Sequence, residues 1–317
     1  MRLVRIIKNW DYPDLFRQTP KNRGIWRDIH FTLKPIKCCD YVIVLNYSPK
    51  KEEVYCPKEN IWCIQQEPHN EYFSVRHKYA SKVYEQVYTT DIRLKGGRYV
   101  YSHGCIPWHI DKSYDELTKS RPSEKMKNLS CISSNKMYFI GQKSRLEFIR
   151  ELQKKLSFDL FGFGIKPIEN KWDALAPYKY SLVLENFSSP YYWSEKIADC
   201  YLSWTMPIYY GCTNITDYFP KESFVKIDVK NTKSIDIIKK TINSNLYNKN
   251  FKAIAYARKL ILEKYQFFPF LTGKIHEWEN KRGKKSPKRT KIIIPNEDTF
   301  LTRMVLNIYR ISRYLLR

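Results

Sequence analysis

Short apolar runs that alternate with helical segments constrain the fold of this chain more than any other feature. The runs are bounded by polar or turn residues, and they cover residues 41–45, 61–64, 86–89, 129–132, 159–163, 181–184, 207–210 and 224–227. Such runs are typical of strands that are buried on both faces of a parallel sheet. Residues 144–156 and 195–204 instead repeat apolar side chains at helical spacing. The alternation predicts an α/β fold with parallel sheets.

The length of the chain indicates two domains. At 317 residues it exceeds the size at which one hydrophobic core usually keeps growing. The polar, proline-bearing segment 111–128 is the best candidate for the domain boundary. We therefore predict an N-terminal domain of residues 1–120, a C-terminal domain of residues 121–270, and a tail of residues 271–317.

The tail combines a basic run with an amphipathic pattern. Residues 281–291 read KRGKKSPKRTK, which is typical of a solvated linker, and residues 300–317 place arginines along one face of a predicted helix. That helix either packs on its own protein or lies on an anionic membrane surface. The neighbouring basic run favours the membrane, so we expect peripheral membrane contact through residues 281–317.

The charge of the chain points to anionic partners. Lys and Arg outnumber Asp and Glu by 56 to 32, which gives a formal net charge of +24. Nucleic acid, an anionic membrane and a phosphate-bearing substrate all fit such a charge. The sequence contains neither zinc-finger spacing nor an RNP-type aromatic strand, so no nucleic-acid partner is expected.

Cysteine usage and the N-terminal residues indicate a cytosolic protein. The 8 cysteines form no C-x-x-C pair and lie mostly in apolar segments, so they indicate neither a zinc site nor a disulfide framework. The first residues, MRLVRIIKNW, are too short and too charged for a signal peptide. We expect a cytoplasmic protein although N-x-[ST] sequons occur.

The segment 181–228 concentrates the polar side chains that indicate chemistry. A strand at 181–184 is followed by a polar loop and by a helix that begins near Glu195. In α/β sheets, ligands bind where such loops leave the strands. Ser194 suits the helix N-cap, but Lys196 in the first turn opposes the helix dipole. A diphosphate bound there would reverse this penalty; in the alternative interpretation, Lys196 points to solvent beside Glu195.

This segment resembles the donor site of glycosyltransferase family 10, the α1,3-fucosyltransferases. The family pattern is F-E-N-S/T, Y-V-T-E-K, P-V/I-Y-x-G and N-I-x-D-F-x-P. Its counterparts here are EN at 185–186, YWSEK at 192–196, PIYYG at 207–211 and NITDYFP at 214–220. The resemblance implies a GT-B fold, in which two Rossmann-like domains face a cleft and the C-terminal domain binds GDP-fucose.

The resemblance also implies roles for individual side chains in donor binding. Lys196 would contact the diphosphate and Glu195 the ribose, while Asn186 and Tyr192 would face the fucose. One departure from the family is Trp193, which replaces a small β-branched residue and is expected to reshape the sugar pocket.

A second diphosphate contact of the family is an arginine near the start of the preceding helix. The stretch KSRLEFI at 143–149 matches it and indicates Arg145, or Arg150 if the register is shifted. Two cations on a diphosphate can neutralise the leaving group as a divalent ion does. The chain has no D-x-D triplet, so we expect donor binding without a metal, although Mn²⁺ or Mg²⁺ can still stimulate product release.

Inverting transfer also needs a base on the face opposite the GDP. The family uses a glutamate after an N-terminal strand, and here the run 61–64 leads to Glu67. Gln-Glu-Pro replaces the usual Gly-Glu-Asn, so the match depends on position and one residue. His69 is the alternative base, because its ordinary pKa suits proton transfer near neutrality. His103 and His109 are candidates to line the acceptor cleft or to serve structural roles.

Together these features predict an inverting fucosyltransferase that uses GDP-fucose and a glycan acceptor with or without a lipid anchor. Surface polysaccharide, lipopolysaccharide or protein glycosylation at the inner face of the cell membrane is the expected setting. Two alternatives stay open: the same fold with another nucleotide-activated deoxysugar, and a non-catalytic basic protein that binds polyanions or membranes.

Overall fold

The computed structural model describes residues 1–69, 80–283, 288–299 and 304. These residues form two compact units. Unit 1 contains Met1–Cys105 together with the segment that begins at Phe267, and unit 2 is Ile106–Gln266. The change of unit thus falls at residue 105 instead of 120, and the chain returns to unit 1 after Gln266.

Unit 1 is built on a seven-stranded sheet in the order β2-β3-β1-β4-β6-β7-β8. All neighbouring strands pair in parallel except β2 and β3. The strands are β1 (Arg2–Ile7), β2 (Ile25–Trp26), β3 (Ile29–Thr32), β4 (Tyr41–Leu45), β6 (Ile61–Ile64), β7 (Gln86–Thr89) and β8 (Tyr99–Tyr101). Every residue of β4 and β6 is buried, as the continuous apolar runs predict for strands that are covered on both faces.

The segment after Gln266 adds a helix and a strand to unit 1. Helix α8 (Phe267–Arg282) packs its aromatic side chains on the sheet, where Trp278 meets Trp62 edge-on at a ring-centroid distance of 6.2 Å. Strand β14 (Arg289–Ile294) pairs antiparallel with β5 (Glu52–Pro57). Within the basic run 281–291, α8 therefore ends at Arg282 and β14 begins at Arg289. The described part of this run is not the solvated linker that the sequence predicts. The predicted helix at 300–317 lies outside the described residues, apart from Met304.

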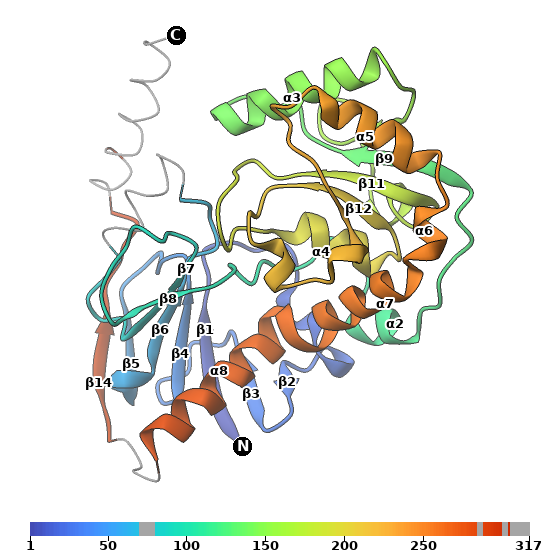
Figure 1. The fold of residues 1–317 in the computed structure, drawn as a ribbon. Coiled ribbons are helices and arrows are strands. Elements are labelled where there is room, and N and C mark those ends of the chain that lie inside the picture. The colour runs from blue at the N-terminus through green and yellow to red at the C-terminus, as the bar shows by residue number, and fades with distance from the viewer. Residues whose placement is uncertain (70–79, 284–287, 300–303, 305–317) are drawn as a thin grey trace. The chain divides into compact units, whose positions relative to one another are not determined.

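Unit 2 is built on a five-stranded parallel sheet in the order β10-β9-β11-β12-β13. Its strands are β9 (Lys127–Ile132), β10 (Asp159–Phe161), β11 (Tyr178–Leu184), β12 (Met206–Tyr210) and β13 (Val225–Lys226). Its helices are α2 (Tyr114–Lys119), α3 (Ile140–Gln153), α4 (Glu195–Leu202), α5 (Lys233–Ile242), α6 (Leu246–Lys249) and α7 (Phe251–Leu260). In Figure 1, the strands run between α3 and α5 on one side and α4 and α7 on the other. The predicted parallel α/β architecture is confirmed.

Short 3₁₀ or π turns connect these elements. Those in unit 1 are η1 (Leu15–Gln18), η2 (Pro20–Asn22) and η3 (Lys58–Asn60); those in unit 2 are η4 (Lys171–Ala174), η5 (Ile215–Asp217), η6 (Lys221–Ser223) and η7 (Ile261–Tyr265).

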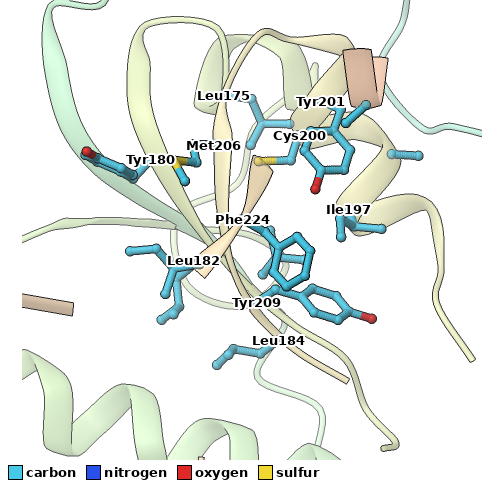
Figure 2. Close-up of a cluster of buried hydrophobic side chains, with 14 of the residues drawn as sticks. Leu175, Tyr180, Leu182, Leu184, Ile197, Cys200, Tyr201, Met206, Tyr209 and Phe224 are labelled. Carbon is cyan, nitrogen blue, oxygen red and sulfur yellow. The ribbon is translucent and has the colours of Figure 1, made fainter. Parts of the chain in front are cut away.

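The core of unit 2 joins the central strands to helix α4. Figure 2 shows Leu182, Leu184 and Met206 of the sheet with Ile197 and Tyr201 of the helix. These side chains are almost fully buried, and the Tyr201 hydroxyl forms a 2.8 Å hydrogen bond with Ser223. Because α4 is fixed along its length by this packing, its N-terminal end has a defined position at the carboxyl edge of the sheet.

The segment 111–128 is a structured part of unit 2. Ser113 and Glu116 form a capping box at the start of α2, in which the Glu116 carboxylate accepts the Ser113 backbone N–H at 2.8 Å. The buried Arg258 donates to the Ser120 hydroxyl at 2.8 Å and to the carbonyl of Leu117. The polar composition of this segment therefore belongs to a capped surface helix, which corrects its interpretation as a linker between domains.

Candidate functional site

The site begins at the N-cap of α4, at the end of the loop that follows β11. Ser194 caps the helix as predicted, and its hydroxyl accepts the Lys196 backbone N–H at 3.4 Å. The fully buried carboxylate of Glu185 accepts the Ser194 backbone N–H at 2.8 Å and the Ser194 hydroxyl proton. Glu185 therefore fixes the start of the helix from inside the protein.

Lys196 is paired with two carboxylates of the protein. Its Nζ lies 3.2 Å from Oε2 of Glu185, 3.5 Å from Oε1 of Glu195 and 2.9 Å from the Ser194 hydroxyl. Burial alone would lower the pKa of Lys196, but Glu185 and Glu195 outweigh it and raise the pKa, so the side chain is a permanent cation. From sequence, Lys196 either contacts a bound diphosphate or points to solvent beside Glu195. The structure changes both interpretations, because the Glu185 carboxylate already offsets the unfavourable position of Lys196 at the positive end of the helix dipole.

Arg145 and Asn186 meet although they are far apart in the sequence. Arg145 projects from α3, is 5% exposed, and donates from Nη1 to Oδ1 of Asn186. Its Nη2 lies 3.4 Å from the carbonyl of Ser134, while its buried Nε has no partner among the described residues. The close approach depends on Gly141, where an added Cβ would lie 1.7 Å from the Asn186 carbonyl oxygen. The structure thus brings two predicted donor-site residues together and leaves one guanidinium donor unused.

Glu195 lies among several cations. Its Oε1 is 3.4 Å from Nζ of Lys171 and 3.7 Å from Nδ1 of His109, in addition to its contact with Lys196. Burial would raise the pKa of Glu195, but the charges of Lys196 and Lys171 and the nearby His109 hold the pKa well below its usual range. Glu195 is therefore an ionised acceptor at neutral pH.

Two residues of this cluster were not predicted from the sequence. Asp199 lies one helical turn after Glu195 and accepts the backbone N–H of His109 at 2.8 Å. Lys171, from η4, lies 3.2 Å from Oδ2 of Asp199. The four-residue spacing of Glu195 and Asp199 was a usable signal for two acids on one helix face. No local pattern pointed to Lys171, because it arrives from a separate loop.

The two histidines that were predicted to serve one cleft fall in different units. His109 contacts Glu195 in unit 2, and burial lowers its pKa. His103 lies in unit 1, where it is buried against the ring of Phe270 at a centroid distance of 4.7 Å.

Tyr192 and Trp193 point to different surroundings. Tyr192 is buried against the ring of Phe187, at a centroid distance of 6.1 Å in an edge-on arrangement. Trp193 is only 3% exposed and packs edge-on against Phe219 at 5.4 Å and Tyr218 at 5.6 Å. Trp193 is therefore a core residue, and the expectation that it reshapes a sugar pocket is wrong.

The loop after β12 supports the loop that carries Glu185. Gly211 leaves room for this acid, since a Cβ there would lie 2.4 Å from Cγ of Glu185. Oδ1 of Asn214 accepts the Tyr191 backbone N–H at 2.7 Å, and the Ser188 hydroxyl donates to the Gly211 carbonyl at 2.8 Å. The sequence motifs around 185, 211 and 214 thus form one packed structure at the sheet edge.

Glu67 and His69 follow β6 at the carboxyl edge of the sheet in unit 1. The preceding residue, Gln66, is held firmly: Trp10 donates to its side chain at 2.9 Å, and its backbone N–H donates to Asn46 at 2.9 Å. Glu67 itself is partly exposed. His69 is buried, lies 3.4 Å from the Thr90 hydroxyl, and has its pKa lowered by burial. Of the two predicted bases, Glu67 is the more accessible.

The ranges that the structure describes contain neither a metal-binding cluster nor a membrane-spanning helix. No group of three or more His, Cys, Asp or Glu side chains is arranged to hold a metal ion there. No helix in those ranges is long and apolar enough to cross a membrane.

Comparison with solved structures shows the class of fold. The DNA-modifying enzyme β-glucosyltransferase aligns over 87% of this chain and 99% of its own, with 11% identity and a TM-score of 0.50. An α1,3-fucosyltransferase with GDP aligns over 84% of this chain and 92% of its own, with 19% identity and a TM-score of 0.48. The first of these alignments shows that the chain shares the α/β fold of that enzyme.

Comparison of sequences shows which family part of the chain resembles. Residues 122–256 match the description "Glycosyltransferase family 10 (fucosyltransferase) C-term". Over 80 residues the chain is 41% identical to the alpha-(1,3)-fucosyltransferase FucT of Helicobacter pylori, which covers 25% of this chain and 16% of that protein. Residues 122–256, less than half of the chain, thus resemble the C-terminal part of this fucosyltransferase family. The region matched to FucT spans only about a sixth of the curated relative.

Proposed function

We propose that the protein is an inverting glycosyltransferase that moves L-fucose from GDP-fucose to a hydroxyl of a glycan acceptor. The observation that carries the proposal is the arrangement of Lys196 and Arg145 at the carboxyl edge of the unit 2 sheet, within the segment that matches family 10. A neighbour in the structural comparison was solved with GDP-fucose, which makes this donor the first to test.

The donor would place its diphosphate at the N-terminal end of α4. Backbone N–H groups and the helix dipole favour an anion there. Lys196 would contact the diphosphate by turning from Glu185, and the unused Nε of Arg145 would supply a second charged donor. Glu195 would accept a ribose hydroxyl, while Asn186 and Tyr192 would face the sugar.

These two cations would stabilise the GDP leaving group electrostatically. We therefore expect donor binding without an obligatory metal. Mn²⁺ or Mg²⁺ would act only as a stimulant of product release. Donor affinity measured in chelator and in added Mn²⁺ should agree within error, whereas loss of GDP binding in chelator would overturn this expectation.

The proposed base is Glu67, with His69 as the alternative. A base removes the proton from the attacking acceptor hydroxyl as the anomeric carbon gains positive charge. A partly exposed carboxylate after β6 suits this role better than a buried histidine whose pKa is lowered. Glu67 lies in unit 1, whereas the residues proposed to bind the donor lie in unit 2.

A thermal-shift panel of GDP-fucose, GDP-mannose and UDP-sugars tests the proposed donor. GDP-fucose should raise the melting temperature more than any UDP-sugar, because a ligand stabilises the state that binds it. A shift with another nucleotide-activated deoxysugar alone would favour the second candidate, the same fold with that donor. No shift with any GDP compound would overturn the donor assignment.

A non-catalytic polyanion-binding protein is the remaining candidate, and the +24 net charge favours it. Lys196→Ala separates the two functions, with Lys240→Ala on α5 as a surface control. Loss of GDP binding in the first variant alone indicates a donor site. Equal, small effects of both variants on heparin binding, with no GDP binding in the wild type, would indicate a polyanion-binding protein.

The biological setting is also a proposal. We place the enzyme at the inner face of the cell membrane, in surface polysaccharide or lipopolysaccharide synthesis or in protein glycosylation, with residues 281–317 on anionic lipid. Removal of residues 300–317 should reduce sedimentation with anionic vesicles. Unchanged sedimentation would exclude the terminal segment as the anchor.

A further inference from the structure

The Glu195 carboxylate is held by one of its two oxygens. Oε1 faces Lys171 at 3.4 Å, Lys196 at 3.5 Å and His109 at 3.7 Å. Oε2 accepts no hydrogen bond from any residue that the structure describes. A carboxylate with one oxygen fixed and the other open is arranged to accept a hydrogen bond from a ligand hydroxyl.

Lys171 is itself fixed by Asp199. Its ammonium group lies 3.2 Å from Oδ2 of this buried acid. Oδ1 of Asp199 accepts the backbone N–H groups of His109 and Ile110 at 2.8 and 3.3 Å. Movement of Lys171 would leave a buried carboxylate without its counter-ion, which is costly. Lys171 therefore stays where it contacts Glu195.

The start of η4 adds a second constraint on Lys171. The side chain of Asn170 accepts the backbone N–H of Trp172 at 2.9 Å and that of Asp111 at 3.2 Å. Burial alone would lower the pKa of Lys171, but Asp199 and Glu195 outweigh it and raise the pKa. The residue is a fixed cation on a short, anchored turn.

Lys196 differs because it has other partners. Its ammonium group also contacts Glu185 and Ser194, at 3.2 and 2.9 Å, and under the proposed function it contacts the donor diphosphate. If Lys196 were the only counter-ion of Glu195, diphosphate binding would weaken the pairing of a buried acid. Lys171 can keep Glu195 paired while Lys196 contacts the diphosphate, because the partners of Lys171 are Glu195 and Asp199.

We propose that Lys171 is a positioning residue that holds Glu195 with Oε2 toward a ribose hydroxyl of the donor while Lys196 is engaged by the diphosphate. This inference rests on the proposed nucleotide donor and adds to that site a residue from outside the family motif. It predicts that Lys171 affects the recognition of the ribose more than the affinity for the diphosphate.

Calorimetric titration with GDP, 2′-deoxy-GDP and 3′-deoxy-GDP tests the proposal. The wild type should bind at least one deoxy analogue about 10- to 100-fold more weakly than GDP, the value of a hydrogen bond to a charged group. Lys171→Met should bind GDP more weakly and lose most of this discrimination. Lys171→Arg, which keeps the charge, should retain it.

The outcomes separate this proposal from the donor assignment. A wild type that binds no GDP overturns the donor assignment. A wild type that binds GDP but does not discriminate, or a Lys171→Met variant that weakens all three ligands equally, overturns the positioning role alone. If Lys171→Met does not fold, Glu195→Gln takes its place in the titration. Loss of discrimination between GDP and the deoxy analogues in Glu195→Gln, together with its retention in Lys171→Arg, supports the proposal. Retained discrimination in Glu195→Gln overturns it.

Discussion

The Oε2 atom of Glu185, which is fully buried, lies 3.2 Å from the Nζ atom of Lys196. The acid also accepts the backbone N–H and hydroxyl of Ser194, so one carboxylate fixes both the cap of α4 and the cation beside it. A ligand anion must therefore compete with, or add to, a counter-ion that the protein already provides. This relationship makes Glu185 as important to the site as the lysine that the sequence singles out.

Glu185→Gln should destabilise the protein and weaken donor binding. Removal of one partner from a buried pair typically costs about 3 to 5 kcal/mol, and we expect the lower end because Lys196 is 22% exposed. Chemical denaturation followed by far-UV circular dichroism measures the loss. Lys196→Met combined with Glu185→Gln should be less destabilised than the sum of the single variants; simple additivity would contradict the pairing.

Gly211→Ala should disturb the same acid without changing any charge. A Cβ at this position would lie 2.4 Å from Cγ of Glu185, and overpacking of this kind typically costs about 1 to 3 kcal/mol. GDP affinity should fall together with stability. Gly273→Ala on α8 is a matched control, because nothing lies within 4 Å of the added atom, and a stability equal to the wild type or higher is expected. Equal effects of the two substitutions would show that contact with Glu185 is not the cause.

Glu67→Gln should abolish transfer and leave GDP affinity unchanged. Loss of a general base typically lowers the rate about 10²- to 10⁴-fold. Single-turnover transfer from radiolabelled GDP-fucose, with GDP titration alongside, measures both quantities. His69→Asn serves as the comparison. If the glutamine variant keeps its rate and the asparagine variant loses it, His69 is the base.

His109 should make the stability of the protein depend on pH. Burial lowers its folded-state pKa below the ordinary value of about 6.5, and Lys171 adds to this, although Glu195 and Asp199 oppose the shift. The unfolded chain then takes up a proton at a higher pH than the folded protein does. The contribution to stability is complete above about pH 6.5 and is lost as the pH falls from there through the folded-state pKa.

Melting temperatures at pH 7.5 and 5.5 test this dependence. The wild type should lose stability at the lower pH, and His109→Asn should lose less. His69, whose pKa burial also lowers, accounts for a further part, so the double variant should show the smallest change. The same pH dependence in all three proteins would contradict the assignment.

The sequence alone determined the local elements and the motif region. The apolar runs contain strands, and Ser194 caps α4, because burial on both faces and capping depend on residues close together in the chain. The family motif led to Arg145, Asn186, Tyr192, Glu195 and Lys196, all of which lie within the matched segment 122–256. Their individual roles stay predictions until donor binding is measured.

Only the tertiary structure decided the partners of these residues. Lys171 reaches Glu195 and Asp199 from 24 and 28 residues away, and Arg145 reaches Asn186 from 41 away, because parallel strands bring distant loops to one sheet edge. The tertiary structure also places Trp193 in the core and assigns α8 and β14 to unit 1. Propensity and periodicity describe neighbours in sequence, whereas ion pairing and packing depend on which segments the sheet topology brings together.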